Sequence, residues 1–183
     1  VHVGLGKRFW DPPTARPTDT PPVPDGLDWD LWLGPAPVRP YHPAYHPWRW
    51  RDWLDFGTGP LGVMGCHTLS TVFKALKLEH PVAIEGTCEG SMGPEIYPRR
   101  FRVRFDFPER DGMPPVSVTW HDEGFDPPIP KDLEPGRRMP GPVFIGDKGT
   151  LIGHRLVPES KMKEFGPPPK VLPRSPGQYK EWV

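Results

Sequence analysis

One histidine, His67, lies in the longest helical pattern of the sequence. Within residues 55–78, apolar side chains recur at three- and four-residue spacing, which predicts a helix that buries one face against a sheet. These side chains are Leu61, Met64, Leu69, Val72, Phe73 and Leu76. A second stripe beside them contains Val63, His67, Ser70 or Thr71, and Lys74. A histidine about two turns inside a rigid helix can accept a substrate proton, and a satisfied core position or a plain exposed position also fits this spacing.

The segment 35–53, PAPVRPYHPAYHPWRWRDW, has no helical or strand period and is dense in ring-bearing side chains. Long connections of this kind inside compact domains are usually functional. Flat aromatic faces beside arginine and aspartate suit a sugar or polyol, whose C–H faces are apolar and whose rim carries hydroxyls. The candidate substrate-binding residues of this region are Tyr45, Trp48, Arg51, Trp53 and Thr58.

A metal site at His42 and His46 is the rival interpretation of the same segment. Histidines four residues apart face the same way only in a helix, and Pro43 and Pro47 disfavour a helix there. Neither a cysteine nor a carboxylate stands at matching spacing. The sequence therefore predicts no metal ligands in this chain.

Glycines 57, 59 and 62 match the GxGxxG pattern of dinucleotide-binding proteins, and a helix and the strand-like PVAIEG follow them. The pattern requires a strand–helix–strand unit with buried parallel strands. Here WRWRDWLDF precedes the glycines, which is not the Val/Ile/Leu run expected of such a strand. We therefore interpret the glycines as a sharp turn into the helix, with Pro60 in its first turn, and we predict no cofactor-binding residues in this chain.

Composition narrows the function classes. The 183 residues carry 23 basic and 23 acidic side chains, so no net charge would attract nucleic acid. No apolar run of membrane-spanning length and no signal-like start is present in the sequence. Cys66 and Cys88 give no disulfide framework and are expected to be small buried residues. Proline is abundant, at 30 residues against a usual ~5%, and with eight Trp it indicates ordered, aromatic-pinned loops.

Several other elements can be predicted from local pattern. Residues 1–10 begin with a short strand, and 27–33 form a short helix with Asp28 as N-cap and Gly34 after its end. Strands over 81–90, 100–107 and 116–121 should present one buried and one wet face, with ERDGMPP joining the last two. PVFIGDKGTLI predicts a hairpin over 142–152, and 161–165 predicts one helical turn. The arginines of 100–107 are expected to lie on the solvated face.

In these segments the chain closely resembles the Gfo/Idh/MocA oxidoreductases of bacteria, the glucose–fructose oxidoreductase and inositol dehydrogenase family. The matching motifs are PTDTPPVPDGLDWDLWLGPAP, RPYHPAYHPWRWRDWLDFGTG, LGVMGCH, GDKGTL and LPRSPGQYKEW. The resemblance implies an α+β fold, a large mostly antiparallel sheet with helices packed on one face. It also implies that residues 1–183 are the C-terminal substrate-binding and oligomer-forming domain. We expect a piece truncated at both ends, since it lacks an initiator Met and a Rossmann NAD(P) domain.

The resemblance assigns His67 as the catalytic proton acceptor or relay. Family members usually place an aspartate four residues before this histidine, and the present chain has Val63 there. A second commonly acidic position on the helix is Ser70. An aspartate at position 63 would orient the imidazole and stabilise its charged form.

The resemblance and the residues together imply the substrate-binding domain of an NAD(P)-dependent oxidoreductase that acts on a sugar, polyol or glycoside. The alternative is a non-catalytic carbohydrate-binding or assembly module derived from the same domain, which the valine at position 63 favours. The chain is not expected to be active alone. NAD or NADP would be bound mainly by the Rossmann domain, which would be a partner, and the sheet would form a homo-oligomer. No nucleic acid or membrane partner is expected.

Overall fold

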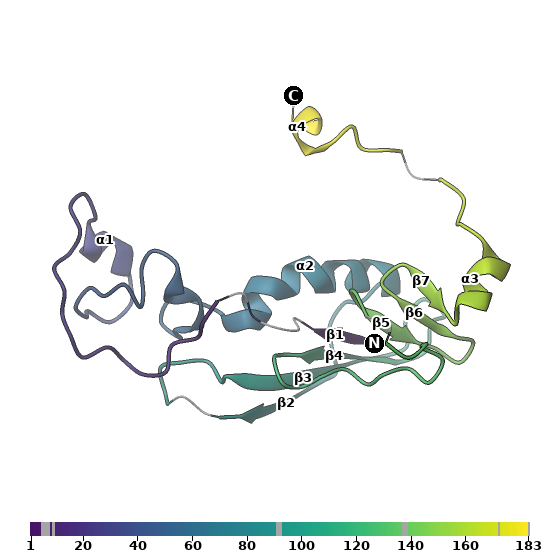
Figure 1. The fold of residues 1–183 in the computed structure, drawn as a ribbon, viewed down its shortest axis with the longest axis horizontal. Coiled ribbons are helices and arrows are strands. Elements are labelled where there is room, and N and C mark those ends of the chain that lie inside the picture. The colour runs from purple at the N-terminus through teal and green to yellow at the C-terminus, as the bar shows by residue number, and fades with distance from the viewer. Residues whose placement is uncertain (5–7, 9, 91–92, 137–138, 172, 183) are drawn as a thin grey trace.

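A seven-stranded sheet forms the body of the protein, and one long helix lies across one of its faces (Figure 1). The computed structural model describes residues 1–4, 8, 10–90, 93–136, 139–171 and 173–182. The strands are β1 (His2–Gly4), β2 (Ala83–Glu89), β3 (Arg100–Phe107), β4 (Val116–His121), β5 (Val143–Ile145), β6 (Thr150–Ile152) and β7 (Arg155–Val157). The helices are α1 (Trp29–Leu33), the 3-10 helix η1 (Arg49–Asp52), α2 (Gly59–Leu76), α3 (Glu159–Phe165) and α4 (Gln178–Glu181).

The strand order is β2-β3-β4-β1-β5-β6-β7. Five of the neighbouring pairs are antiparallel, and β1 runs parallel to β4. Strand β1 therefore joins the β2–β4 group to the β5–β7 group. The mostly antiparallel sheet and its covering helix confirm the predicted α+β fold class. Within the described residues, none of the helices combines the length and apolar character that a bilayer crossing requires.

Helix α2 confirms the predicted apolar stripe. Val72 is fully buried against the sheet residues Val118 and Trp120. Around this contact, partly buried side chains of the same helix complete the core: Leu61, Met64, Leu69 and Leu76. Phe73 stays 36% exposed and meets Phe107 edge-on, with ring centroids 5.6 Å apart. The helix face with Val72 thus fixes α2 against β4 and its neighbours.

The predicted alternation of buried and wet faces is correct for one strand and wrong for two. β3 alternates as expected, with exposed arginines and partly buried apolar residues. Every residue of β2 is exposed, because it is an edge strand and none of its residues packs into the core that α2 covers. In β4 the supposedly wet residues Thr119 and His121 are buried, because this strand lies between β3 and β1 and the His2 ring contacts the His121 ring.

The two predicted hairpins are present. The turn between β3 and β4 contains Asp111 and Gly112, both with positive φ, and Arg110 pairs with Met113 beside it. The turn between β5 and β6 is closed by a hydrogen bond from Gly146 N to Gly149 O of 3.0 Å. Strand β7 was not predicted, because three residues after a glycine turn carry too little pattern.

Helix α1 has the predicted cap, since the Asp28 carboxylate accepts from Leu31 N at 3.0 Å and Gly34 follows with φ 55. Helix α3 is longer than the predicted turn at 161–165. The segment after α3 leads away from the sheet to α4 (Figure 1). The prediction of buried cysteines is wrong, because Cys66 and Cys88 are both exposed, the first on α2 and the second on the edge strand.

Candidate functional site

The turn between η1 and α2 depends on glycine, as predicted. Gly57 N donates to Trp53 O at 2.8 Å, and a Cβ on Gly57 would lie 2.2 Å from the Arg51 carbonyl oxygen. Gly59 has φ +62, and a Cβ there would lie 2.8 Å from the Tyr97 ring. Only glycine fits both the backbone conformation and this close packing. The turn therefore fixes how the aromatic segment leads into the helix.

A short stretch of paired backbone attaches this turn to residues 95–97. Leu54 N donates to Glu95 O and Tyr97 N donates to Asp52 O, both at 2.9 Å. Trp53 forms an antiparallel bridge with Ile96 between these bonds. The aromatic segment is therefore attached to the chain that leads directly into β3.

A buried charge network, which sequence reasoning missed, holds η1 in place. Arg8 Nη1 donates to Asp52 Oδ1 at 3.3 Å, and Arg8 Nη2 donates to Asp122 Oδ2 at 2.5 Å. Trp10 Nε1 also donates to Asp52 Oδ2 at 2.5 Å. The three charged side chains are at most 1% exposed. Because the partners are far apart in sequence, the only local signal was an aspartate set among aromatic residues.

Opposing effects act on the pKa of each of the two carboxylates in this network, some raising it and others lowering it. Burial raises the pKa of Asp52, while the Trp10 hydrogen bond and the Arg8 charge act in the lowering direction. Burial also raises the pKa of Asp122, against the hydrogen bond and charge of Arg8. The guanidinium between them offsets only part of the cost of burying two carboxylates, because the pKa of each stays raised.

The predicted residues Tyr45 and Trp53 lie in an aromatic core and not at the surface. Tyr45 is 2% exposed and Trp53 is fully buried. Their ring centroids are 4.7 Å apart, and Trp53 Nε1 donates to Ala44 O at 2.9 Å. The rings that surround them are Trp29, Trp32, Tyr41 and Phe56. Contact of these two rings with a substrate stays a prediction, while the structure shows them packed within the chain.

Arg39 supports the same aromatic core from one side. Its guanidinium carbon lies 4.9 Å from the centroid of the Phe56 ring and 5.5 Å from that of Tyr45. Its Nη2 pairs with Asp55, which is partly exposed. Cation–π contacts and this ion pair hold a nearly buried arginine between the rings and solvent.

Trp48 and Arg51 form the exposed part of the predicted substrate region. The Trp48 side chain is 51% exposed, and the Arg51 guanidinium carbon lies 3.8 Å from the centroid of its ring. The Trp50 ring lies on the same guanidinium at 4.9 Å, and Arg51 Nη1 donates to the Trp48 carbonyl oxygen. These contacts hold an indole at the surface in a fixed orientation.

Thr58 borders a hollow between the start of α2 and strands β2 and β3. The hollow has a volume of about 550 Å³. Its walls are largely apolar and include Leu61, Tyr97, Phe101 and Val103. Thr58 is the N-cap residue of α2, and its carbonyl oxygen accepts from Gly62 N at 3.2 Å. None of the other four predicted substrate residues lines this hollow.

His67 is exposed on the side of α2 that faces away from the sheet. Gly65 and Val72 of the same helix are buried, whereas His67 and Ser70 are exposed and Val63 is partly exposed. His67 follows Thr58 by nine positions, which on a helix is ~14 Å along the axis and roughly half a turn around it. The Thr58 hollow and His67 therefore lie on different sides of the helix. Element η1, which carries Arg51, contacts α2.

The structure gives His42 and His46 separate environments. His42 Nδ1 accepts from Ala44 N at 3.0 Å, and its Nε2 lies 3.2 Å from Asp19 Oδ1. The His46 ring meets the Trp32 ring edge-on, with centroids 5.7 Å apart. In the described part of the chain, no three histidine, cysteine or carboxylate side chains are grouped as metal ligands.

The glycines of the GxGxxG match do not fit a dinucleotide. Space beside each glycine is taken by atoms of this chain: the Arg51 carbonyl at Gly57, the Tyr97 ring at Gly59 and the Thr58 side chain at Gly62. The preceding element is η1 and not a strand, and β2, the strand that follows α2, pairs antiparallel with β3. The pyrophosphate cradle of the strand–helix–strand unit is thus not formed by these residues.

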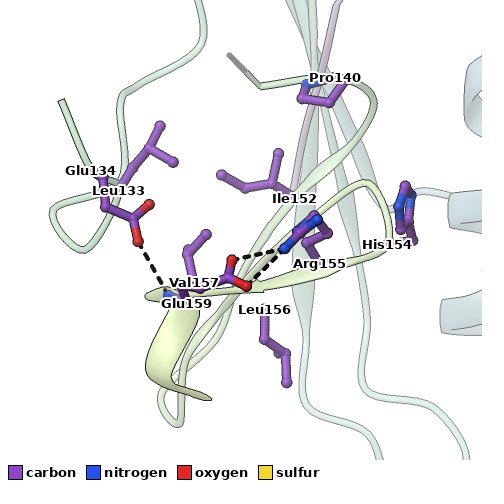
Figure 2. Close-up of a pocket in the computed structure, with 9 residues that line it drawn as sticks. All are labelled: Leu133, Glu134, Pro140, Ile152, His154, Arg155, Leu156, Val157 and Glu159. Carbon is purple, nitrogen blue, oxygen red and sulfur yellow. Dashed lines mark hydrogen bonds and ion pairs between the residues drawn. The ribbon is translucent and has the colours of Figure 1, made fainter. Parts of the chain in front are cut away.

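A smaller hollow of about 240 Å³ lies between the β6–β7 hairpin and the residues Leu133, Glu134 and Pro140 (Figure 2). Its charged side chains are engaged with one another. Arg155 Nη2 pairs with both oxygens of Glu159, at 2.9 and 2.8 Å, and Glu134 Oε1 accepts from Glu159 N at 3.2 Å. These bonds fix the start of α3, which is a structural role.

The geometry supports two chemical capacities. An exposed imidazole on a rigid helix can accept a proton from a hydroxyl that binds beside it. An exposed indole stacked on a guanidinium can contact the apolar face of a ring while its surroundings supply polar contacts.

A protein-family model matches residues 6–97, and its description is oxidoreductase family, C-terminal alpha/beta domain (GFO_IDH_MocA_C2). The matched range contains η1, α2 and all six predicted site residues. No curated protein matches the chain.

Proposed function

Because this chain belongs to the Gfo/Idh/MocA oxidoreductase family as its C-terminal alpha/beta domain, we propose that it binds the substrate of an NAD(P)-dependent oxidation of a sugar, polyol or glycoside. The observation that carries the proposal is the exposed position of His67 on the outward face of α2. A rigid helix presents the ring to whatever binds there, and the family match supplies the reaction class.

His67 takes the hydroxyl proton in this proposal. Oxidation of an alcohol needs one acceptor for that proton and another for the hydride. The family usually uses NAD or NADP as the hydride acceptor, and no residue of this chain is assigned to hold it. A dinucleotide-binding partner domain is therefore part of the proposal.

Trp48 and Arg51 hold the sugar ring in this proposal. The half-exposed indole would contact the C–H face of a sugar, and the stacked Arg51 keeps it in place. Tyr45 and Trp53 act from behind, since their buried rings fix the segment that carries Trp48. Thr58 lies on another side of α2 from His67, so it would contact only a part of a larger substrate, such as a glycoside, that is remote from the reacting hydroxyl.

Self-association through the sheet is the second part of the proposal. The seven residues of β2 are exposed, and its outer edge has no neighbouring strand in the described sheet. Val82, just before this strand, and Ile84 within it are 71% and 63% exposed. An unpaired strand edge with apolar side chains favours pairing with a second chain.

A non-catalytic carbohydrate-binding or assembly module is the alternative. The observation in its favour is Val63, one helical turn before His67, because a valine cannot orient or charge-stabilise an imidazole. In that case the Trp48 and Arg51 surface would still bind sugar, and His67 would have no part in turnover.

Steady-state turnover with NAD⁺ and NADP⁺ on a panel of sugars and polyols tests the proposal. The assay uses the chain joined behind a dinucleotide-binding domain of the same family. We expect His67→Ala to lower kcat by about 10²–10⁴-fold, the usual contribution of a general base. His80→Ala is the matched control, because His80 is also exposed and lies just after α2. Unchanged turnover in His67→Ala would contradict the role of His67, and sugar binding without any turnover would favour the module.

A further inference from the structure

The face of the sheet turned away from α2 carries a polar hollow of about 480 Å³. Two cross-strand rows form its floor. Glu85, Arg104, Thr119 and His2 are direct neighbours across β2, β3, β4 and β1. Thr87, Arg102 and His121 form the next row. Residues from four strands thus form one site, on the face of the sheet opposite to the one that is covered by α2, the helix that carries His67.

The two arginines of this floor differ in their commitments. Arg104 Nε donates to Asp106 Oδ1 at 2.9 Å, and its Nη2 donates to Ser117 Oγ at 3.3 Å, so its head is held by the chain. The Arg102 guanidinium carbon lies 5.6 Å from the centroid of the Phe125 ring. Among the described residues, no carboxylate or carbonyl oxygen is paired with this guanidinium. Arg102 therefore keeps its donor fork available for an anionic group.

The two histidines of the floor act as a neutral pair. His2 Nδ1 lies 3.0 Å from His121 Nε2, a contact in which one ring must donate and the other accept. His121 is 5% exposed. Burial lowers the pKa of His2 to about 4 and also lowers that of His121. At neutral pH the pair adds polar atoms to the hollow without adding positive charge.

The remaining groups suit hydroxyls. Thr87 and Thr119 can donate and accept, while the carboxylates of Glu85 and Asp126 can only accept. An anion without hydroxyls would leave these two carboxylates without donors, and a neutral polyol would meet the Arg102 fork only through neutral hydrogen bonds, which are weaker than the charge-assisted pair that a carboxylate forms. A ligand with one acidic group and several hydroxyls satisfies both sets.

We propose that this hollow binds a small sugar acid, with the ligand carboxylate on Arg102 and its hydroxyls on Thr87, Thr119, Glu85 and Asp126. The site does not depend on His67 or on NAD(P), and it leaves the edge of β2 free. Its size exceeds that of a single sugar ring, so water would share the hollow with the ligand.

Calorimetric titration of the full chain at pH 7 with D-glucuronate, D-glucose and inorganic phosphate tests this site. We expect D-glucuronate to bind at least about tenfold more tightly than D-glucose, because only the acid forms a charge-assisted pair of hydrogen bonds with the Arg102 fork. We also expect it to bind more tightly than phosphate, which has no ring hydroxyls for the carboxylates. Equal affinity for the acid and the neutral sugar, or stronger binding of phosphate, would overturn the assignment.

Variants locate the binding. Arg102→Ala should weaken D-glucuronate binding by about tenfold or more, and Arg102→Lys should weaken it less, because lysine keeps the charge but loses the fork. Arg174→Ala is the control, since it removes an exposed arginine far along the chain and should leave the affinity within about twofold. Thermal unfolding of each variant confirms folding. If Arg102→Ala binds like the parent, or no probe binds the parent, the proposal is wrong.

Discussion

Arg8 and Asp122, 114 residues apart in sequence, meet through a hydrogen bond of 2.5 Å between side chains that are at most 1% exposed. The same guanidinium reaches Asp52 in η1. One arginine therefore links the beginning of the described chain, the aromatic segment and the residue after β4. This link holds η1, and with it the turn into α2, against the residue that follows β4.

Replacing Arg8 should destabilise the fold strongly. Arg8→Met leaves two buried carboxylates without their cation, which typically costs about 3–5 kcal/mol. Urea unfolding measures the change. Arg16→Met is the control, because Arg16 forms an exposed ion pair with Glu95 and its loss should cost only about 0–1 kcal/mol. Similar costs for both variants would show that the buried network does not hold the fold.

Acid should weaken the fold through His2. Its pKa is lowered to about 4 by burial first, then by the amino group of Val1 and by His121. Between pH 6.5 and about 4 the unfolded chain binds more protons at this residue than the folded chain, so the free energy of unfolding falls as pH falls. His2→Gln should flatten this decline in urea unfolding at pH 7, 6 and 5, and exposed His80→Gln should not. A decline of equal slope in both variants would refute the role of His2.

Gly59 should not tolerate a side chain, because the Tyr97 ring lies close to it. Gly59→Ala places a Cβ 2.8 Å from the Tyr97 ring at φ +62, and we expect a loss of about 1–3 kcal/mol. Gly86→Ala is the matched control, because a Cβ there meets no atom within 4 Å. Chemical denaturation of both variants gives the comparison. A Gly59→Ala protein as stable as Gly86→Ala would mean that the ring moves aside at little cost.

An aspartate at position 63 should increase activity. Helix positions four apart bring Cβ atoms to about 5–6 Å, so a carboxylate at 63 can reach the His67 ring and raise its basicity. We expect Val63→Asp to increase NAD(P) reduction in the fused protein relative to the parent. The increase should disappear in Val63→Asp with His67→Ala. A gain that survives loss of His67 would place the effect elsewhere.

Charge on the edge strand should reduce self-association. Ile84→Lys puts a positive charge on an exposed residue of β2, a substitution that hinders edge pairing. Sedimentation velocity over a range of concentrations should show a lower average mass for Ile84→Lys than for the parent. Lys180→Ala in α4, which leaves β2 unchanged, should behave like the parent. A parent chain that is monomeric at all concentrations would contradict assembly through β2.

The sequence predicted features whose causes are local. Helix α2 followed from its apolar spacing, α1 from Asp28 and Gly34, and the β3–β4 hairpin from alternation around a glycine turn. Each of these needs only neighbouring residues to specify it. The family resemblance then supplied the sheet and its topology class.

Features that depend on distant partners escaped prediction. Arg8 meets Asp52 and Asp122 only in the folded chain. The burial of Tyr45 was hidden for the same reason, since an aromatic residue in a loop can equally face a ligand or other rings. The exposure of β2 follows from its place at the sheet edge, which its own alternation does not encode. The arginine pattern of β3 identified a wet face but not the hollow, which needs His2 and His121 from other strands.

The place of β1 in the middle of the sheet also has a consequence for the order of folding. Strands β2 to β4 and β5 to β7 can each form from pairs that are close in sequence, whereas β1 must wait for both. Its parallel partner lies more than a hundred residues later, as the bond from Val1 N to Ser117 O shows. We therefore expect the three residues of β1 to close the sheet after its two halves exist, and local opening of β1 would separate those halves while leaving each one paired within itself.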